Sequence, residues 1–321
     1  MNRSSRHLLG LVLVAAALAG CGSASDQAMR LSLAALETKA HPVASPSSSA
    51  SPTCTGLTAS LRPPATLPTA GAMPQGSFMR TIQRRGYLIA GVNAGLYHFG
   101  YLNPATGKID GFEIDLVREL ARAILGDPAK FRLVALSVPQ RIPFVQQGRV
   151  DVVVDAVTIT CERKQQADFS TVYYDAQQRV LVPSDSPAVD IHSFADQRVC
   201  ASAQSQPIKV MSALPNGPIP YGAPQAIDCL VLLQQGRVPA ISTDDSILLG
   251  FKAQDPNLRI IGGSLADVPY GMAISKAHPE FVRFVNGVMA KLRADGTWQS
   301  LHNKWLGHLS SPTPPPAQYD G

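Results

Sequence analysis

Residues 146–150 read QQGRV, and residues 234–238 repeat the same five letters. Each copy ends a predicted helix and opens an apolar strand, which runs to Asp155 in the first case and to Ser242 in the second. Glycine is favoured just after a helix, because it adopts the left-handed backbone conformation without strain. Two ordinary helix–strand turns would also explain the repeat, but its identical place in the two halves favours two similar αβ lobes.

The surrounding sequence alternates strands with helices. Apolar strands are predicted at 87–92, 131–136 and 151–154, and residues 113–125 carry one apolar helical face. A second helix is expected to begin near Pro139. Such alternation predicts an α/β fold with a parallel or mixed sheet and helices on both faces.

Composition narrows the class of protein. The chain has 321 residues, 45% of them hydrophobic and 16% charged, which is enough for two domains with sizeable cores. The formal charge is only +5, and no basic stripe with interleaved aromatic residues is present, so nucleic acid is not an expected partner. Phosphate-binding loops and paired metal-ligand motifs are also missing from the sequence, so neither a cofactor nor a metal is expected.

The first 20 residues have the pattern of a secretory signal peptide. Basic Arg3 and Arg6 precede an apolar stretch at 8–18, which is too short to span a membrane. Residues 18–21, Leu-Ala-Gly-Cys, resemble the lipobox of bacterial lipoproteins, which predicts acylation of Cys21 and an anchor on the outer face of the cell membrane. The alternative is a soluble secreted protein with a chance cysteine.

Two further segments are poor in core-forming residues. Residues 21–77 contain the lipidation cysteine followed by a stretch rich in proline and serine, which predicts an extended tether. Residues 310–321 include three consecutive prolines and are predicted to form a disordered tail.

Four cysteines remain once Cys21 is set aside, and four cysteines allow three full pairings. Cys200 and Cys229 both fall in the second lobe, so we expect them to pair and close a local loop. By elimination, Cys54 would then pair with Cys161. Separate buried thiols are the alternative, although an exported protein favours disulfides.

Several motifs resemble one known family, in order along the chain and at the usual spacing. They are Gly91-Val92-Asn93, residues 109–116 (IDGFEIDL), Arg141-Ile142-Pro143, residues 158–163 (TITCER), Asp168-Phe169-Ser170, Tyr173-Tyr174 and, in the last predicted helix, residues 295–298 and 304–307. Together they resemble the family 3 extracellular solute-binding proteins, which bind amino acids for ABC transporters. The three cysteines after residue 160 are most similar to those of the actinobacterial glutamate/glutamine-binding lipoproteins.

The resemblance implies a fold of the type II periplasmic binding proteins, with two αβ lobes joined by two crossing hinge strands and the ligand in the cleft. Lobe 1 would comprise residues 78–179 and 268–309, and lobe 2 residues 180–267. The hinge strands would lie near 180–183 and 269–274. A monomer is expected.

The resemblance also implies the residues that bind the ligand's backbone. The planar guanidinium of Arg163 would clamp the α-carboxylate, although a surface arginine in a loop is the alternative. Thr158 would add a hydroxyl or a backbone N–H, and Ala156 a backbone carbonyl. Asp244 would bind the ammonium group, unless Asp244 or Asp245 simply caps the following helix.

Departures from the family pattern affect two loops. Residues 203–207 lack the usual glycines and gain Pro207, yet Ser205 and Gln206 could still contact the carboxylate at a helix start. Leu96 lies in a loop where relatives often place an aromatic residue and a proline. In that loop His98 could make the site sensitive to pH, but a structural role for a lone histidine is more common.

The sequence says less about which ligand side chain the site selects than about how it binds the ligand's backbone groups. Asn93 occupies a position where relatives read the tip of the ligand, and an amide fits either an amide or an acid. Asp155, if it faced the cleft, would disfavour a ligand carboxylate, whereas Arg141 or Arg179 would favour one. A structural role beside Pro143 is expected for Arg141. The resemblance favours glutamate, aspartate and their amides.

Three functions are compatible with these residues. A binding protein that passes an amino acid to an ABC permease is favoured, and an amino-acid sensor that signals through a membrane partner would need the same pocket. A dehydratase-like enzyme on the same fold is the third candidate and would use Asp155 as its unexpected acid. A binder of quaternary ammonium compounds is not expected, because both tryptophans fall in the last helix rather than around a cleft. No catalytic residue is therefore assigned.

Overall fold

The computed structural model describes residues 54–307 and 313–320, which lie in the second of two compact units, Pro42–Gly321. The predicted signal peptide, Cys21 and the first part of the predicted tether lie outside the described residues, as do residues 308–312 and 321.

Lobe 1 is built on a mixed five-stranded sheet. Its strands, in spatial order, are β5 (Phe131–Ala135), β1 (Leu88–Val92), β6 (Val152–Val153), β13 (Ala273–Ile274) and β7 (Asp168–Phe169). Its helices are α2 (Phe78–Arg85), α3 (Phe112–Leu125), α4 (Arg141–Gln146), α5 (Cys161–Gln166), α9 (Pro279–Ala294) and α10 (Thr297–Leu306), with a 3₁₀ turn η1 (Val138–Gln140) before α4. A small sheet of β2 (Gly95–Leu96), β3 (Gly100–Asn103) and β4 (Lys108–Asp110) adjoins them.

Lobe 2 has a second mixed five-stranded sheet. Its strands are β10 (Ile219–Ala223), β9 (Arg198–Ser202), β11 (Ala240–Asp244), β8 (Tyr174–Pro183) and β12 (Leu258–Tyr270). Its helices are α6 (Gln206–Ala213), α7 (Ala226–Gln234) and α8 (Asp245–Gln254), with a 3₁₀ turn η2 (Ile191–Phe194). Each lobe has its own cluster of buried apolar side chains, so each lobe packs around a separate core.

The repeated QQGRV stretch forms the same turn in both lobes. Gly148 and Gly236 each have a φ of 66°, the left-handed conformation that favours glycine. In each copy the following arginine donates its backbone N–H to a carbonyl five residues earlier, which closes the last turn of α4 or α7. The predicted α/β fold with two lobes is confirmed, and the repeat marks one equivalent helix–strand turn in each.

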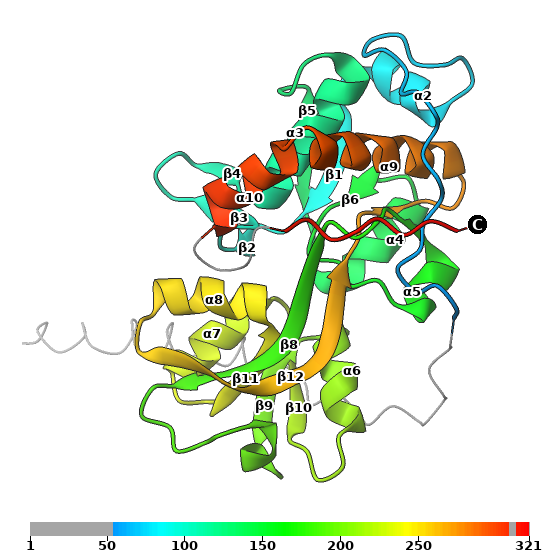
Figure 1. Cartoon of the computed structure of the whole chain (residues 1–321). Coiled ribbons are helices and arrows are strands. Elements are labelled where there is room, and N and C mark those ends of the chain that lie inside the picture. Colours follow the sequence, from blue (N-terminus) through cyan, green and yellow to red (C-terminus); the bar gives the residue numbers. More distant parts are fainter. Residues whose placement is uncertain (1–53, 308–312, 321) are drawn as a thin grey trace, which may run out of the picture. The chain divides into compact units, whose positions relative to one another are not determined.

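Two long strands connect the lobes. β8 and β12 pair antiparallel, first within the lobe 2 sheet and then, beyond an irregularity between Ile261 and Ala266, along residues 174–178 and 266–270. Figure 1 shows both strands running side by side out of the lobe 2 sheet toward lobe 1. Their far ends enter lobe 1, where Tyr270 pairs with Thr158.

The predicted hinge positions need one correction. Residues 180–183 lie inside the lobe 2 sheet, because Val180 and Leu181 pair with β11 on one side and β12 on the other. Gln178 also pairs with β11, so the first crossing segment is the earlier part of β8, at 174–177. A boundary between residues 179 and 180 cuts one continuous strand, and a local sequence pattern does not show where such a strand passes from one lobe to the other.

The predicted tether also needs correction over its described part, residues 54–77, which we call the N-terminal arm. The arm packs on lobe 1: the Ser60 hydroxyl is buried and donates to the Phe169 carbonyl at 2.6 Å, and the Asn286 amide donates to the Leu61 carbonyl at 2.7 Å. Met73 is also buried. The expected tail is likewise ordered over 313–320, where Tyr319 forms a parallel bridge with Ser60.

Both expected disulfides are present. Cys200–Cys229 joins β9 to α7 within lobe 2, and Cys54–Cys161 joins the N-terminal arm to the first residue of α5. The Cα–Cα distances of 5.6 Å and 5.5 Å lie in the ordinary range for disulfides. The second bridge explains in part why residues 54–77 are docked rather than free.

Across the described part of the chain, no helix has both the length and the apolar character needed to cross a membrane. The same residues contain no group of three or more histidine, cysteine, aspartate or glutamate side chains that could hold a metal ion.

Candidate functional site

One cavity between the lobes brings together all eight residues that the sequence analysis assigned to ligand binding. Lobe 1 contributes Asn93, Leu96, Ala156, Thr158 and Arg163, and lobe 2 contributes Ser205, Gln206 and Asp244. The free volume is about 20 Å³, and one water molecule needs roughly 10–15 Å³. The two lobes therefore converge closely at this point.

Contacts outside the cavity also cross between the lobes. The Gln225 amide, at the start of α7, donates to the carbonyl of Leu136 in lobe 1 at 3.3 Å. Lys209 of α6 forms an ion pair with Glu162 of α5, and both side chains are about half exposed. The two lobes therefore also touch each other outside the cavity, on more than one side of it.

Arg163 is placed by the short helix α5. The Thr160 side chain caps this helix by accepting from the Arg163 backbone N–H at 3.2 Å, and Cys161 anchors its first residue through the disulfide. The Arg163 guanidinium donates through Nη1 to the Thr158 carbonyl at 2.7 Å and forms no ion pair with any described residue. Burial, followed by the nearby positive charge of Arg141, lowers the Arg163 pKa to about 10. A positively charged group without a carboxylate partner thus lines the cavity.

Asp244 lines the same cavity as Arg163 but lies in lobe 2. It ends β11 and stands at the N-cap position of α8, but its side chain makes no capping bond. Its Oδ2 accepts from the Tyr270 hydroxyl at 2.6 Å, while its Oδ1 is buried with no partner among residues 54–307 and 313–320. Burial raises the Asp244 pKa to about 6. Asp245, the first residue of α8, instead accepts from the Ser246 backbone N–H at 2.7 Å and from the Gln177 backbone N–H at 3.2 Å.

The start of α6 contributes polar groups from the loop that departs from the family pattern. Ser205 is the N-cap residue, yet its hydroxyl makes no capping bond and is buried without a partner in the described part of the chain. Pro207 occupies the first helical turn, where a backbone N–H would lack an intrahelical acceptor anyway. Gln204 adopts a φ of 58°, a left-handed conformation that favours glycine, so this turn forms here without one.

Ala156 and Asn93 form the lobe 1 side of the cavity. Ala156 has a φ of 43°, and its backbone N–H donates to Glu113 Oε1 at 2.6 Å, which holds this uncommon conformation in place. Asn93 Oδ1 accepts from the Gly95 backbone N–H at 2.8 Å. That bond uses one of the two lone pairs of the amide oxygen and fixes the orientation of the side chain, whose NH₂ group remains a donor for other partners.

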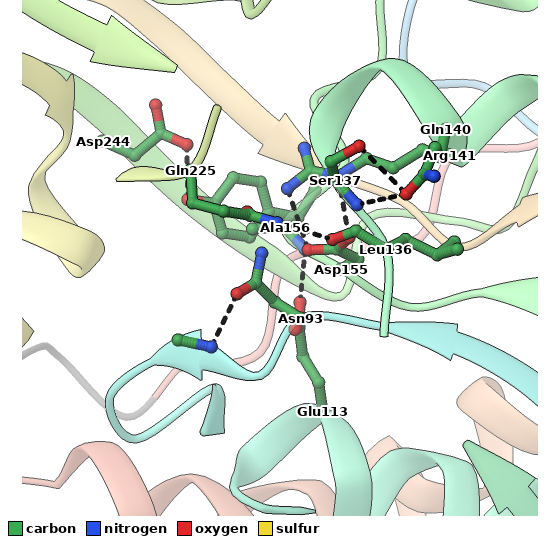
Figure 2. Close-up of polar contacts among 12 residues, drawn as sticks. Asn93, Glu113, Leu136, Ser137, Gln140, Arg141, Asp155, Ala156, Gln225 and Asp244 are labelled. Atoms are coloured by element: carbon green, nitrogen blue, oxygen red, sulfur yellow. Dashed lines mark hydrogen bonds and ion pairs between the residues drawn. The ribbon is translucent and has the colours of Figure 1, made fainter. Parts of the chain in front are cut away.

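Arg141 also lines the cavity, although the sequence analysis favoured a structural role for it over a contact with the ligand. A capping box between Ser137 and Gln140 starts the helical segment that carries it. Its guanidinium forms two hydrogen bonds of 2.8 Å with the Asp155 carboxylate. Figure 2 shows this pair beside Asn93, with Glu113 approaching Ala156 from the side of α3.

Asp155 lies behind the cavity rather than in its wall. It is fully buried and is not a lining residue, so it does not face the cleft as an isolated acid. Burial raises its pKa, and the Arg141 charge and hydrogen bonds oppose that rise. An acid held in this pair lacks the exposure that a catalytic role in the cleft would require. His98 is not a lining residue either.

Sequence reasoning missed Glu113. This fully buried acid accepts hydrogen bonds from Ala156 N–H and from the Tyr173 hydroxyl, and burial followed by the Asp155 charge raises its pKa to about 7. An acid near a helix start is ordinarily explained by the helix dipole, so the sequence offered no distinct signal for this role.

Comparison with known proteins identifies the family. Residues 88–308 match the model of the bacterial extracellular solute-binding proteins, family 3. The chain belongs to this family. The family is one of extracellular solute-binding proteins, so the chain is a solute-binding transport component rather than a catalyst.

Individual relatives are moderately similar. The ABC transporter glutamine-binding protein GlnH of Bacillus subtilis is 30% identical over 236 residues, which is 71% of this chain and 84% of that protein. A glutamine-binding protein of Geobacillus stearothermophilus is 35% identical over 203 residues, covering 62% and 76% of the two chains. A solved structure of an ancestral arginine-binding protein bound to glutamine superposes with a TM-score of 0.65 at 29% identity, covering 70% of this chain and 99% of that one. These matches confirm the type II periplasmic binding protein fold.

Proposed function

We propose that this protein is a lipid-anchored extracytoplasmic receptor that captures a polar amino acid of the glutamine/glutamate type and passes it to an ABC-type permease. Arg163 binds the ligand's α-carboxylate and Asp244 its α-ammonium group. Thr158, Ala156, Ser205 and Gln206 supply the remaining polar contacts, and Leu96 packs against the ligand.

One observation supports this assignment most strongly: two opposite charges without ion-pair partners among the described residues line the same cavity from different lobes. Arg163 keeps guanidinium donors beyond its one bond to Thr158, and Asp244 Oδ1 is buried without a donor. Leaving such groups unpaired costs free energy unless a ligand completes them. An amino-acid zwitterion carries the matching carboxylate and ammonium in one molecule.

The same placement couples binding to closure. A ligand held by Arg163 in lobe 1 and Asp244 in lobe 2 contacts both lobes only when they are together, so it favours the closed state. Because the cavity is about the size of one or two water molecules, the lobes open for the ligand to enter. The names of the two glutamine-binding relatives support the ligand class and the transport role.

Lipid anchoring rests on the sequence at residues 18–21 alone. Cys21→Ser removes the acceptor thiol, and we expect the variant to be recovered in the soluble fraction of fractionated cells, whereas the unaltered protein stays with membranes. Retention of the variant in membranes would contradict the anchor without affecting the ligand assignment.

The proposed ligand class is tested by a thermal-shift screen of the full-length protein, purified in mild detergent, against the twenty amino acids, followed by calorimetry on each hit. A ligand that binds only the folded protein raises its melting temperature by mass action. We expect shifts with polar amino acids of the glutamine/glutamate type. A folded, ligand-free protein that responds to none of the twenty would overturn the proposal.

A further inference from the structure

Arg141 lines the cavity in a fixed orientation, although its sequence context favoured a purely structural role. It is 7% exposed, begins α4, and uses Nε and Nη2 for two hydrogen bonds of 2.8 Å to the two Asp155 oxygens. Such a two-point contact fixes the guanidinium plane as well as its position. Arg141 is therefore a rigid part of the wall, in contrast to Arg163, which has no acidic partner within the described residues.

Behind this arginine the buried charges are not positive overall. Asp155 and Glu113 are both 0% exposed, and both interact electrostatically with Arg141. One guanidinium thus faces one ionised carboxylate and a second carboxyl group whose pKa is about 7. Whether Glu113 is protonated or ionised, this group of three side chains carries a net charge of zero or below.

The wall nevertheless offers hydrogen-bond donors. Arg141 has five N–H groups, of which Asp155 engages Nε and one on Nη2. The Asn93 amide nitrogen has two N–H groups, so it can serve Asp155 with one and a ligand with the other. Donors without net positive charge suit a neutral carbonyl oxygen. A carboxylate moved into the same place would lose its hydration without gaining a compensating charge.

The charges that remain unpaired are already matched by the ligand's backbone. Arg163 and Asp244 contribute one positive and one negative charge, which balance an α-carboxylate and an α-ammonium group. A ligand with an acidic side chain would add one negative charge to a cavity in which the other cation, Arg141, is neutralised by Asp155.

From this arrangement we infer that Asp155, acting through Arg141, sets the side-chain selectivity of the site, so that the protein prefers amino acids with an uncharged carboxamide side chain over the corresponding acids. The inference rests on the proposed function and narrows its ligand class. Asp155 is a positioning residue, since it lies behind the wall and does not line the cavity.

The first test compares matched ligands on the unaltered protein. Calorimetry of the full-length protein at pH 7.5 with glutamine, glutamate, asparagine and aspartate isolates the side-chain charge, because each amide and its acid have nearly the same shape. We expect the better amide to bind at least about tenfold more tightly than its acid, since a like charge or an unpaired charge at a buried contact is strongly disfavoured. Equal binding, or tighter binding of the acid, would overturn the inference.

The second test removes the neutralising charge. Asp155→Asn keeps the side-chain shape and makes the net charge of the Arg141–Asp155–Glu113 group more positive, so we expect the acid-to-amide affinity ratio to rise at least about tenfold. Adding Arg141→Gln in the double variant removes a positive charge from the same group and is expected to return the ratio toward amide preference. A purely structural role for Asp155 would weaken all four ligands alike and leave the ratio unchanged, which would contradict the inference.

A matched control exists elsewhere in lobe 1. Asp151 is also a buried acid, 4% exposed, paired with Arg85 and bonded to the Ile89 backbone N–H at 2.7 Å, but it does not line the ligand cavity. Asp151→Asn is expected to lower the melting temperature and leave the acid-to-amide ratio unchanged. A comparable shift of the ratio in this control would show that the Asp155→Asn effect is not local, and would overturn the inference.

The outcomes separate the two proposals. Failure of all amino acids to bind a folded protein would contradict the proposed function. Binding with acid preference would contradict only the selectivity inference. The comparison of amides with acids on the unaltered protein needs no variant, so it decides the inference even if Asp155→Asn fails to fold.

Discussion

The two arginines in the wall of the cavity, Arg141 and Arg163, are in opposite electrostatic situations. Arg141 is held by a two-point bond to a buried acid, whereas Arg163 has only a backbone carbonyl as a partner among the described residues. The lobe 2 acid that faces them, Asp244, likewise keeps one oxygen without a partner in the described chain. A buried charge without a partner can bind a group of opposite charge on the ligand. A buried charge that is already paired cannot compensate a further charge, so the site disfavours ligands that carry one there.

The largest effect is expected at the unpaired arginine. Arg163→Ala should weaken amino-acid binding by about a hundredfold or more, because the ligand α-carboxylate would lose a charged two-point donor and stay buried. Calorimetry with the best ligand measures the change. Arg149→Ala is the control: this exposed arginine stacks on Phe144 at 3.6 Å, away from the cavity, and its loss should leave affinity within about twofold. If Arg163→Ala kept full affinity, Arg163 would not be the arginine that binds the ligand's α-carboxylate, and its contrast with Arg141 would not hold.

A smaller loss, of about ten- to a hundredfold, is expected for Asp244→Asn, since the amide keeps the shape but not the charge that pairs with the ligand ammonium. The same change should raise the melting temperature of the ligand-free protein. Its pKa of about 6 lies above the ordinary value for aspartate, so the ionised form is destabilising in the folded protein at pH 7.5.

Thermal unfolding and calorimetry of this variant measure the two opposite effects separately. The neighbouring Asp245→Asn should change neither by much, because the asparagine oxygen can accept from the same two backbone N–H groups and residue 245 does not line the cavity. If Asp244→Asn lowered both affinity and stability, the carboxylate would be serving the fold rather than the ligand.

Affinity should also depend on pH. Asp244 is ionised above about pH 6 and becomes protonated below it, and only the ionised form attracts the ligand ammonium. The dissociation constant should therefore rise by up to about tenfold per pH unit as the pH falls below 6. Glu113, with a pKa of about 7, titrates nearby, so the Asp244→Asn variant is the reference: its affinity should be nearly flat between pH 5 and about 6. An equally steep dependence in the variant would assign the effect to another group.

The smallest effect is expected for the exposed pair that links the lobes beside the cavity. Glu162→Gln breaks its ion pair with Lys209, and both side chains are about half exposed. Exposed pairs contribute roughly 0–1 kcal/mol and are screened by salt, so the affinity should fall by less than about fivefold and the difference should vanish at high salt. If Glu162→Gln lost as much affinity as Arg163→Ala, the exposure of a charged side chain would not predict how much it contributes to ligand binding.

The sequence predicted the binding residues more successfully than the surrounding packing. All eight predicted residues line one cavity because the motifs around Arg163 and Asp244 are short and local: a capping threonine, a strand end and a helix start place them. Their roles in ligand binding remain proposals. The Arg141–Asp155 pair, in contrast, joins residues 14 positions apart on different elements, and Glu113 reaches Ala156 across 43 positions.

The N-terminal arm is a second case in which long-range contacts could not be predicted from the local sequence. Its many prolines predicted an extended spacer, since proline-rich sequence cannot form a regular core. Composition describes the average of the segment, whereas docking depends on a few particular contacts, such as buried Ser60 and the disulfide of Cys54. Those contacts involve lobe 1 residues more than 100 positions away, which no local pattern contains.

By itself, therefore, the sequence predicted the αβ lobes, the resemblance to the family, the disulfide pairs and eight of the residues that line the cavity, because each depends on local backbone preferences, the positions of the cysteines or contiguous motifs. The tertiary structure alone decided where the crossing strands lie, that residues 54–77 pack on lobe 1, and which of the charged groups are neutralised. A charge is paired or unpaired only through partners brought together by folding, and that distinction separates the binding groups of this cavity from the groups that set its selectivity.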